Sequence, residues 1–154
     1  MADGLRAGKP EKLTGHVIRD SSLGLVPETL PAIMEMLRLR NARAVNGVFC
    51  KSMRYDIARA DGLTEEKVAQ IDDDYPASRL GEREKLVLAF ADLYLRTPVR
   101  VDPAVAAQLR REFTPAELTH MAIGLATFHA LSRCAVSLGG MPESLPVMEL
   151  PGPA

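Results

Sequence analysis

The 154-residue sequence has no large excess of either charge and no long apolar run, and these absences exclude several classes of protein. Nineteen lysines and arginines are balanced by 20 aspartates and glutamates, so no basic surface for nucleic acid or anionic lipid is indicated. The first 20 residues carry charges throughout, which excludes the apolar segment of a secretion signal, and no apolar run has membrane length. We therefore expect a cytoplasmic protein without nucleic-acid or membrane partners.

Cysteine is also scarce. Cys50 and Cys134 are the two cysteines, and without a secretion signal we expect free thiols rather than a disulfide framework. Whether these two could pair stays open, because a disulfide needs Cα atoms within about 7 Å. Phosphate-binding glycine loops and nucleophile elbows are absent. His120 and His129 are nine residues apart, a poor metal-ligand spacing, so we expect neither a metal nor another cofactor.

The sequence does contain repeated helix start and stop signals, without a convincing alternating strand, and it therefore predicts an all-α fold. One hydrophobic core is expected at this length. We expect residues 1–20 to form a flexible arm, residues 21–141 a single compact bundle of about six helices, and residues 142–154 a proline-stiffened extended tail.

Caps and apolar spacing predict where the helices lie. The predicted spans are Pro31 to Asn46-Gly47, Cys50 to Gly62, a short helix after Thr64, Glu82 to Arg96, Asp102-Pro103 to Phe113, and Thr114 to Gly139-Gly140. The last helix is apolar on nearly every face between Met121 and Leu131, so we expect part of it to contact another subunit.

The most specific pattern lies between Glu35 and Arg54. The carboxymuconolactone decarboxylase and alkylhydroperoxidase D family has a Glu, then Cys-x-x-Cys beginning twelve residues later, then a His four residues after the second Cys. Glu35 and Cys50 match this pattern. Gly47 occupies the position of the first cysteine, and Arg54 occupies the position of the histidine. The chain from Pro31 to Gly139 resembles a divergent member of that family.

This resemblance implies a compact helical bundle of the alkylhydroperoxidase D-like type that assembles as a homo-oligomer, a trimer or hexamer. It also implies an enzyme acting on a small molecule, either a carboxymuconolactone decarboxylase-like lyase or a peroxiredoxin-type oxidoreductase. A relay between two motif cysteines is excluded, because Gly47 has no thiol.

Glu35, Cys50 and Arg54 are the predicted catalytic residues. Cys50 is expected near a helix start, where backbone N–H groups favour a thiolate, with Arg54 on the same helical face; otherwise Cys50 is a small buried apolar residue. Arg54 keeps its proton and can bind an anion, unless it is solvated or paired with an acid. Glu35 would move a proton if buried beside Cys50, and otherwise lies on the surface or pairs with Arg54.

Arg54, Tyr55 and His129 are the predicted substrate-binding residues. His129 is the one nearby titratable group that could replace the motif histidine, although such a residue is more often a core histidine with satisfied hydrogen bonds. Tyr55 is more commonly a packing residue with a polar end. Three functions remain open at this point. A lyase acting on a small anionic substrate through Glu35 and Arg54 is favoured slightly over a peroxidase that uses Cys50, with an external thiol or Cys134 resolving it. The third is a non-catalytic, oligomeric ligand-binding protein.

Overall fold

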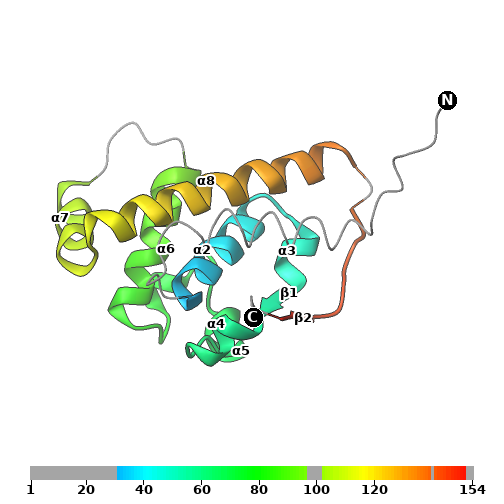
Figure 1. The fold of residues 1–154 in the computed structure, drawn as a ribbon, viewed down its shortest axis with the longest axis horizontal. Helices are drawn as coiled ribbons and strands as arrows, with labels where there is room; N and C mark the ends of the chain where they lie inside the picture. Colours follow the sequence, from blue (N-terminus) through cyan, green and yellow to red (C-terminus); the bar gives the residue numbers. More distant parts are fainter. Residues whose placement is uncertain (1–30, 97–101, 140, 152–154) are drawn as a thin grey trace.

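The computed structural model describes residues 31–96, 102–139 and 141–151, which form a helical bundle with one small two-stranded sheet (Figure 1). The predicted all-α class is therefore confirmed. The predicted arm, residues 1–20, and the last three residues of the predicted tail lie outside the described residues. In chain order the elements are α2 (Pro31–Ala44), α3 (Val48–Ser52), β1 (Met53–Tyr55), α4 (Asp56–Ala60), α5 (Glu65–Ala69), the 3-10 helix η1 (Tyr75–Ala77), α6 (Glu82–Leu95), α7 (Pro103–Glu112), α8 (Pro115–Ser137) and β2 (Met148–Leu150).

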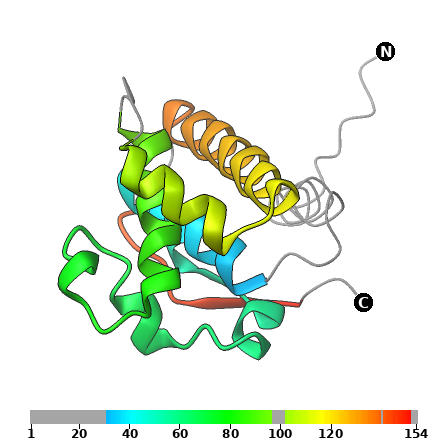
Figure 2. The ribbon, with the colours of Figure 1, turned by 90° about the vertical axis from the view of Figure 1, so that its left-hand side faces the viewer.

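Helix α2 is the centre of the bundle. It packs against α8 and α6 and also contacts α3 and α4 (Figure 1, Figure 2). Residues 33–42 are all buried. The predicted stop is confirmed, with Asn46 as the left-handed residue at φ 55°. The N–H groups of Asn46 and Gly47 donate to the carbonyls of Arg43 and Ala42, at 3.2 and 2.8 Å, which completes the helix end. A helix enclosed in this way must satisfy its polar side chains within the protein.

Helix α8 begins with the predicted capping box. Thr114 Oγ1 accepts from the Glu117 N–H at 3.2 Å, and Glu117 Oε2 accepts from the Thr114 N–H at 2.7 Å. Its inner stripe packs against α2, where Met121 and Leu125 are fully buried. Exposed residues on its other side include Ala122, Ile123 and Ala130. Within the described chain the enclosed helix is therefore α2, and the expected contact of α8 with another subunit stays a prediction.

The predicted continuous helix from Cys50 to Gly62 is wrong. The chain instead forms α3, the short strand β1 and α4. Strand β1 pairs in parallel with β2, with Met53 opposite Met148 and Tyr55 opposite Leu150. Helical spacing within the segment cannot reveal a partner strand that lies in the C-terminal tail.

Arginine side chains also stabilise this break. Arg38 donates to the carbonyls of Cys50 and Met53, and Arg54 donates to those of Lys51 and Met53. These carbonyls would accept from N–H groups four residues later if the helix continued. Since they have other donors here, the helix can end without leaving buried carbonyls unpaired.

Part of the C-terminal tail is docked on the bundle. Beyond the β1–β2 pairing, Ser52 Oγ donates to the Leu145 carbonyl at 3.2 Å, and Arg59 forms an ion pair with Glu149 at 3.1 Å. The tail thereby holds the segment that follows Cys50 against the bundle.

Candidate functional site

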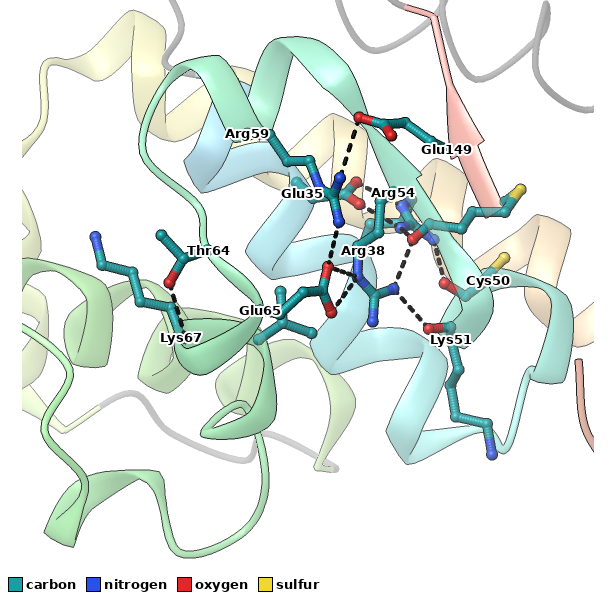
Figure 3. Close-up of polar contacts among 12 residues, drawn as sticks. Glu35, Arg38, Cys50, Lys51, Arg54, Arg59, Thr64, Glu65, Lys67 and Glu149 are labelled. Atoms are coloured by element: carbon teal, nitrogen blue, oxygen red, sulfur yellow. Dashed lines mark hydrogen bonds and ion pairs between the residues drawn. The ribbon is translucent and has the colours of Figure 1, made fainter. Parts of the chain in front are cut away.

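Glu35, the predicted acid, is buried in α2 and bound by Arg38 one turn later. Arg38 Nε donates to Oε2 at 2.7 Å and Arg38 Nη2 to Oε1 at 2.5 Å. The two side chains are only 3% and 1% exposed. Both carboxylate oxygens are therefore occupied by one guanidinium, and the alternative in which Glu35 pairs with Arg54 is not what the structure contains (Figure 3).

Arg38 was not singled out by the sequence pattern, yet it connects the predicted site residues. Besides Glu35 it binds the carbonyls of Cys50 and Met53, and its guanidinium carbon lies 5.5 Å from the centre of the Tyr55 ring. Burial lowers the pKa of Arg38, but the charge and hydrogen bonds of Glu35 outweigh burial and raise it above its ordinary value. The available signal was an acid and an arginine three residues apart inside an apolar helix.

Arg54 is buried at 6% exposure and is already paired. Its Nε donates to both carboxylate oxygens of Glu65, at 3.0 and 3.2 Å, and its Nη1 donates to the carbonyls of Lys51 and Met53 (Figure 3). Burial raises the pKa of Glu65, but Arg54 and Arg59 together outweigh burial and lower it. The alternative in which Arg54 is the partner of a nearby acid is therefore observed, and the expected position on one helical face with Cys50 is wrong, because α3 ends at Ser52.

Cys50 lies in the first turn of α3, and its thiol is free and partly exposed. The Ser132 hydroxyl, on α8, donates to the Cys50 sulfur at 3.8 Å. Cys134 is also free and is exposed on α8. Since it follows Ser132 by two residues, about 200° around the helix, its side chain projects away from the face that meets Cys50. The two cysteines therefore do not form the disulfide that the sequence left open.

The Cys50–Ser132 contact continues through α2 to His129. Asn41 Nδ2 donates to Ser132 Oγ at 3.1 Å, and Asn41 Oδ1 lies 3.0 Å from His129 Nδ1. The edge of the His129 ring also meets Tyr94, with ring centres 5.7 Å apart. Asn41 and Ser132 are 0% and 2% exposed, so both polar groups need hydrogen-bond partners within the protein.

The side chains of the predicted site residues thus have three separate sets of side-chain partners, although Arg38 also binds the carbonyls of Cys50 and Met53. Glu35 binds Arg38, Arg54 binds Glu65, and Cys50 connects through Ser132 and Asn41 to His129. Tyr55 packs beside Arg38 at the edge of the core. Asn41 and Ser132 were not among the predicted site residues. Each is a polar residue within the apolar stripe of a helix, which was an available signal.

The described ranges contain no group of three or more His, Cys, Asp or Glu residues arranged to hold a metal ion. Among the helices described, none is both long enough and apolar enough to cross a membrane.

Comparisons with known proteins add sequence relatives. Two uncharacterized proteins of Mycobacterium tuberculosis, from strains CDC 1551 / Oshkosh and ATCC 25618 / H37Rv, are each 31% identical to this chain over 109 residues. The alignment covers 71% of this chain and 38% of each relative, so the matched part of the chain spans well under half the length of these proteins. No protein-family model matches the chain, and no solved structure matches it.

Proposed function

We propose that the protein is a thiol-dependent oxidoreductase in which Cys50 reduces a small hydroperoxide. The observation that carries this proposal is the Ser132 hydroxyl directed at the partly exposed Cys50 sulfur, at the end of a hydrogen-bonded chain from His129. A donor at this position stabilises a thiolate, which is the nucleophilic form of cysteine. The protein would then be a divergent member of the carboxymuconolactone decarboxylase and alkylhydroperoxidase D family that works with one motif cysteine.

The reaction is a two-electron oxidation of sulfur. The Cys50 thiolate attacks the outer oxygen of the hydroperoxide, an S–O bond forms and the O–O bond breaks. The departing alkoxide takes one proton and leaves as an alcohol, and Cys50 becomes a sulfenic acid. A thiol then attacks the sulfenic sulfur and releases water, and a second thiol reduces the resulting mixed disulfide, which returns the Cys50 thiol.

The resolving thiol has to come from outside this chain. Cys134 is on the far side of α8 from Ser132, and Gly47 occupies the position where the motif has its other cysteine. A partly exposed Cys50 is accessible to a small external thiol.

Two contacts make the lyase less well supported than the oxidoreductase. An acid–base role for Glu35 requires that it first leave Arg38, which holds both of its oxygens. Binding of a substrate anion by Arg54 requires displacement of Glu65. Breaking either pair leaves a buried arginine without its carboxylate, which is costly.

The proposal includes a cytoplasmic homo-oligomer, a trimer or hexamer. Exposed apolar side chains on α8, Ile123 at 43% and Val136 at 39%, support a contact between copies. Light scattering coupled to gel filtration gives the molecular mass, and a monomer at micromolar concentration would contradict this part.

Peroxide consumption in the presence of excess dithiothreitol tests the activity. We expect turnover of hydrogen peroxide or cumene hydroperoxide by the wild type and by Cys134→Ser, and loss of turnover in Cys50→Ser. Mass spectrometry after reaction with dimedone should place the sulfenic acid on Cys50. Unchanged consumption by Cys50→Ser, or no turnover by the wild type, would refute the proposal. Conversion of an anionic substrate that Glu35→Gln and Arg54→Ala both abolish would instead support the lyase.

A further inference from the structure

The chain of contacts between His129 and Cys50 has a defined direction. Asn41 donates through Nδ2 to Ser132 Oγ at 3.1 Å, so its Oδ1 is the atom that faces His129 Nδ1 at 3.0 Å. An amide oxygen only accepts, and therefore Nδ1 of His129 has to carry a proton. Ser132 already accepts from Asn41 and directs its own proton to the Cys50 sulfur at 3.8 Å. Every donor in the series thus points toward Cys50.

We infer that Asn41 and His129 are positioning residues that act through Ser132 to stabilise negative charge on the Cys50 sulfur. This inference rests on the proposed function for its biological meaning, although its physical content concerns the thiolate alone. Asn41 orients the Ser132 hydroxyl, because a serine that accepts from the amide has its proton free for the sulfur. His129 in turn holds the amide in the orientation that donates to Ser132.

Burial makes this arrangement effective. Asn41 and Ser132 are 0% and 2% exposed, so water does not compete for their hydrogen bonds. Successive hydrogen bonds in a low-dielectric interior polarise one another, and the last donor becomes stronger. His129 contacts Tyr94 on α6 and Asn41 on α2. The charged side chain of Arg38 binds the Cys50 carbonyl.

The test measures the rate at which iodoacetamide alkylates Cys50 at pH 7, in a Cys134→Ala background so that one thiol reacts. Ser132→Ala should react about three- to tenfold more slowly, since a hydrogen bond to a charged group is lost and the lower nucleophilicity of a stabilised thiolate offsets part of that loss. Ser132→Thr retains the hydroxyl and should react within about twofold of the background protein.

Asn41→Asp tests the direction of the chain. A carboxylate has nearly the same shape as the amide but only accepts, so it would draw the Ser132 proton away from the sulfur. The rate should then fall as in Ser132→Ala. His129→Gln, which supplies an N–H donor, should retain more of the rate than His129→Phe, which supplies none.

Circular dichroism and thermal unfolding identify variants that fail to fold. If Asn41→Asp fails to fold, the comparison of Ser132→Ala with Ser132→Thr still tests the inference. Equal rates for these two serine variants, or faster alkylation of Ser132→Ala than of the background protein, would overturn the inference. Slower alkylation together with absent peroxide turnover would leave the positioning role intact and refute the proposed function. Peroxide turnover that depends on Cys50, together with unchanged alkylation rates in the variants, would support the proposed function and refute the positioning role.

Discussion

Asn41 Oδ1 lies 3.0 Å from His129 Nδ1 and joins the interior of α2 to α8. The side chain of Asn41 is fully buried and bonds on its other side to Ser132. Asn41→Leu should lower the free energy of unfolding by about 1–3 kcal/mol, because Ser132 and His129 lose a partner in the interior. Urea unfolding followed by circular dichroism measures this loss. Gln108→Ala, at an exposed position on α7, is the control and should change stability by less than about 0.5 kcal/mol.

The buried Glu35–Arg38 pair should be far more important for stability than an exposed pair of the same spacing. Glu35→Gln leaves the charge of Arg38 buried without a carboxylate, and we expect a loss of about 3–5 kcal/mol in urea unfolding. Glu82 and Lys85 provide the matched control, because they pair at 3.3 Å with Glu82 93% exposed. Glu82→Gln should cost less than about 1 kcal/mol. Equal losses in the two variants would contradict the structural role of Arg38.

His120 should make the folded state sensitive to mild acid. It is 1% exposed, neither ring nitrogen has a hydrogen-bond partner within the described part of the chain, and burial lowers its pKa. The unfolded chain therefore takes up a proton at higher pH than the folded protein does. The stability that neutral His120 contributes is complete above its ordinary pKa of about 6.5 and is lost as the pH falls toward the lowered value.

Urea unfolding at pH 7.5 and pH 5.5 measures this effect. The wild type should lose stability between these values, and His120→Leu should lose less of it. Met121→Leu changes the next residue without removing a titratable group, so it should keep the pH dependence of the wild type. An identical loss in His120→Leu and the wild type would show that His120 is not the group responsible.

Strand β2 should protect β1 from solvent exchange. Deleting residues 146–154 removes the partner of Met53–Tyr55, and the amides of β1 should then exchange hydrogen faster in mass-spectrometric measurements. Glu149→Gln removes only the half-exposed ion pair to Arg59 and should leave exchange nearly unchanged. Unaltered protection of β1 after the deletion would mean that the strand pairing adds little.

Gly47→Cys should allow a reversible disulfide between residue 47 and Cys50. A Cβ atom at Gly47 would lie 3.8 Å from Ser132 Oγ, in ordinary contact, and Ser132 Oγ is also 3.8 Å from the Cys50 sulfur. Gly47 has φ -77°, which a cysteine adopts without strain. In a Cys134→Ala background, mild oxidation should convert both thiols to a disulfide, so that no free thiol is detected, and dithiothreitol should restore the two thiols.

Gly81→Cys is the matched control for that experiment, because Gly81 also caps a helix and has room for a side chain but precedes α6. Its thiol should remain free after the same treatment. Two persistent thiols in Gly47→Cys would show that residues 47 and 50 cannot approach closely enough in this fold.

Much of the helical framework was predictable because the contacts that set helix ends are local. Thr114 and Glu117 cap each other across three residues, Asp102 accepts from the Ala104 N–H, and Asn46 takes the left-handed conformation two residues after the end of α2. Each of these contacts involves residue types whose preferences hold with little help from the rest of the fold. The apolar stripes of α6 and α8 are also local patterns, and they predicted the all-α class.

The sequence by itself therefore determined the helical class, most helix boundaries and the presence of Glu35, Cys50 and Arg54 in one short segment. Tertiary structure alone decided which partners these residues have, because Glu65, Ser132 and the β2 strand come from other parts of the chain. It also decided that β1 interrupts the helix after Cys50, since carbonyls there accept from Arg38 and Arg54. Spacing along a sequence records which side chains share a helix face, whereas hydrogen bonds between distant segments depend on how the faces pack.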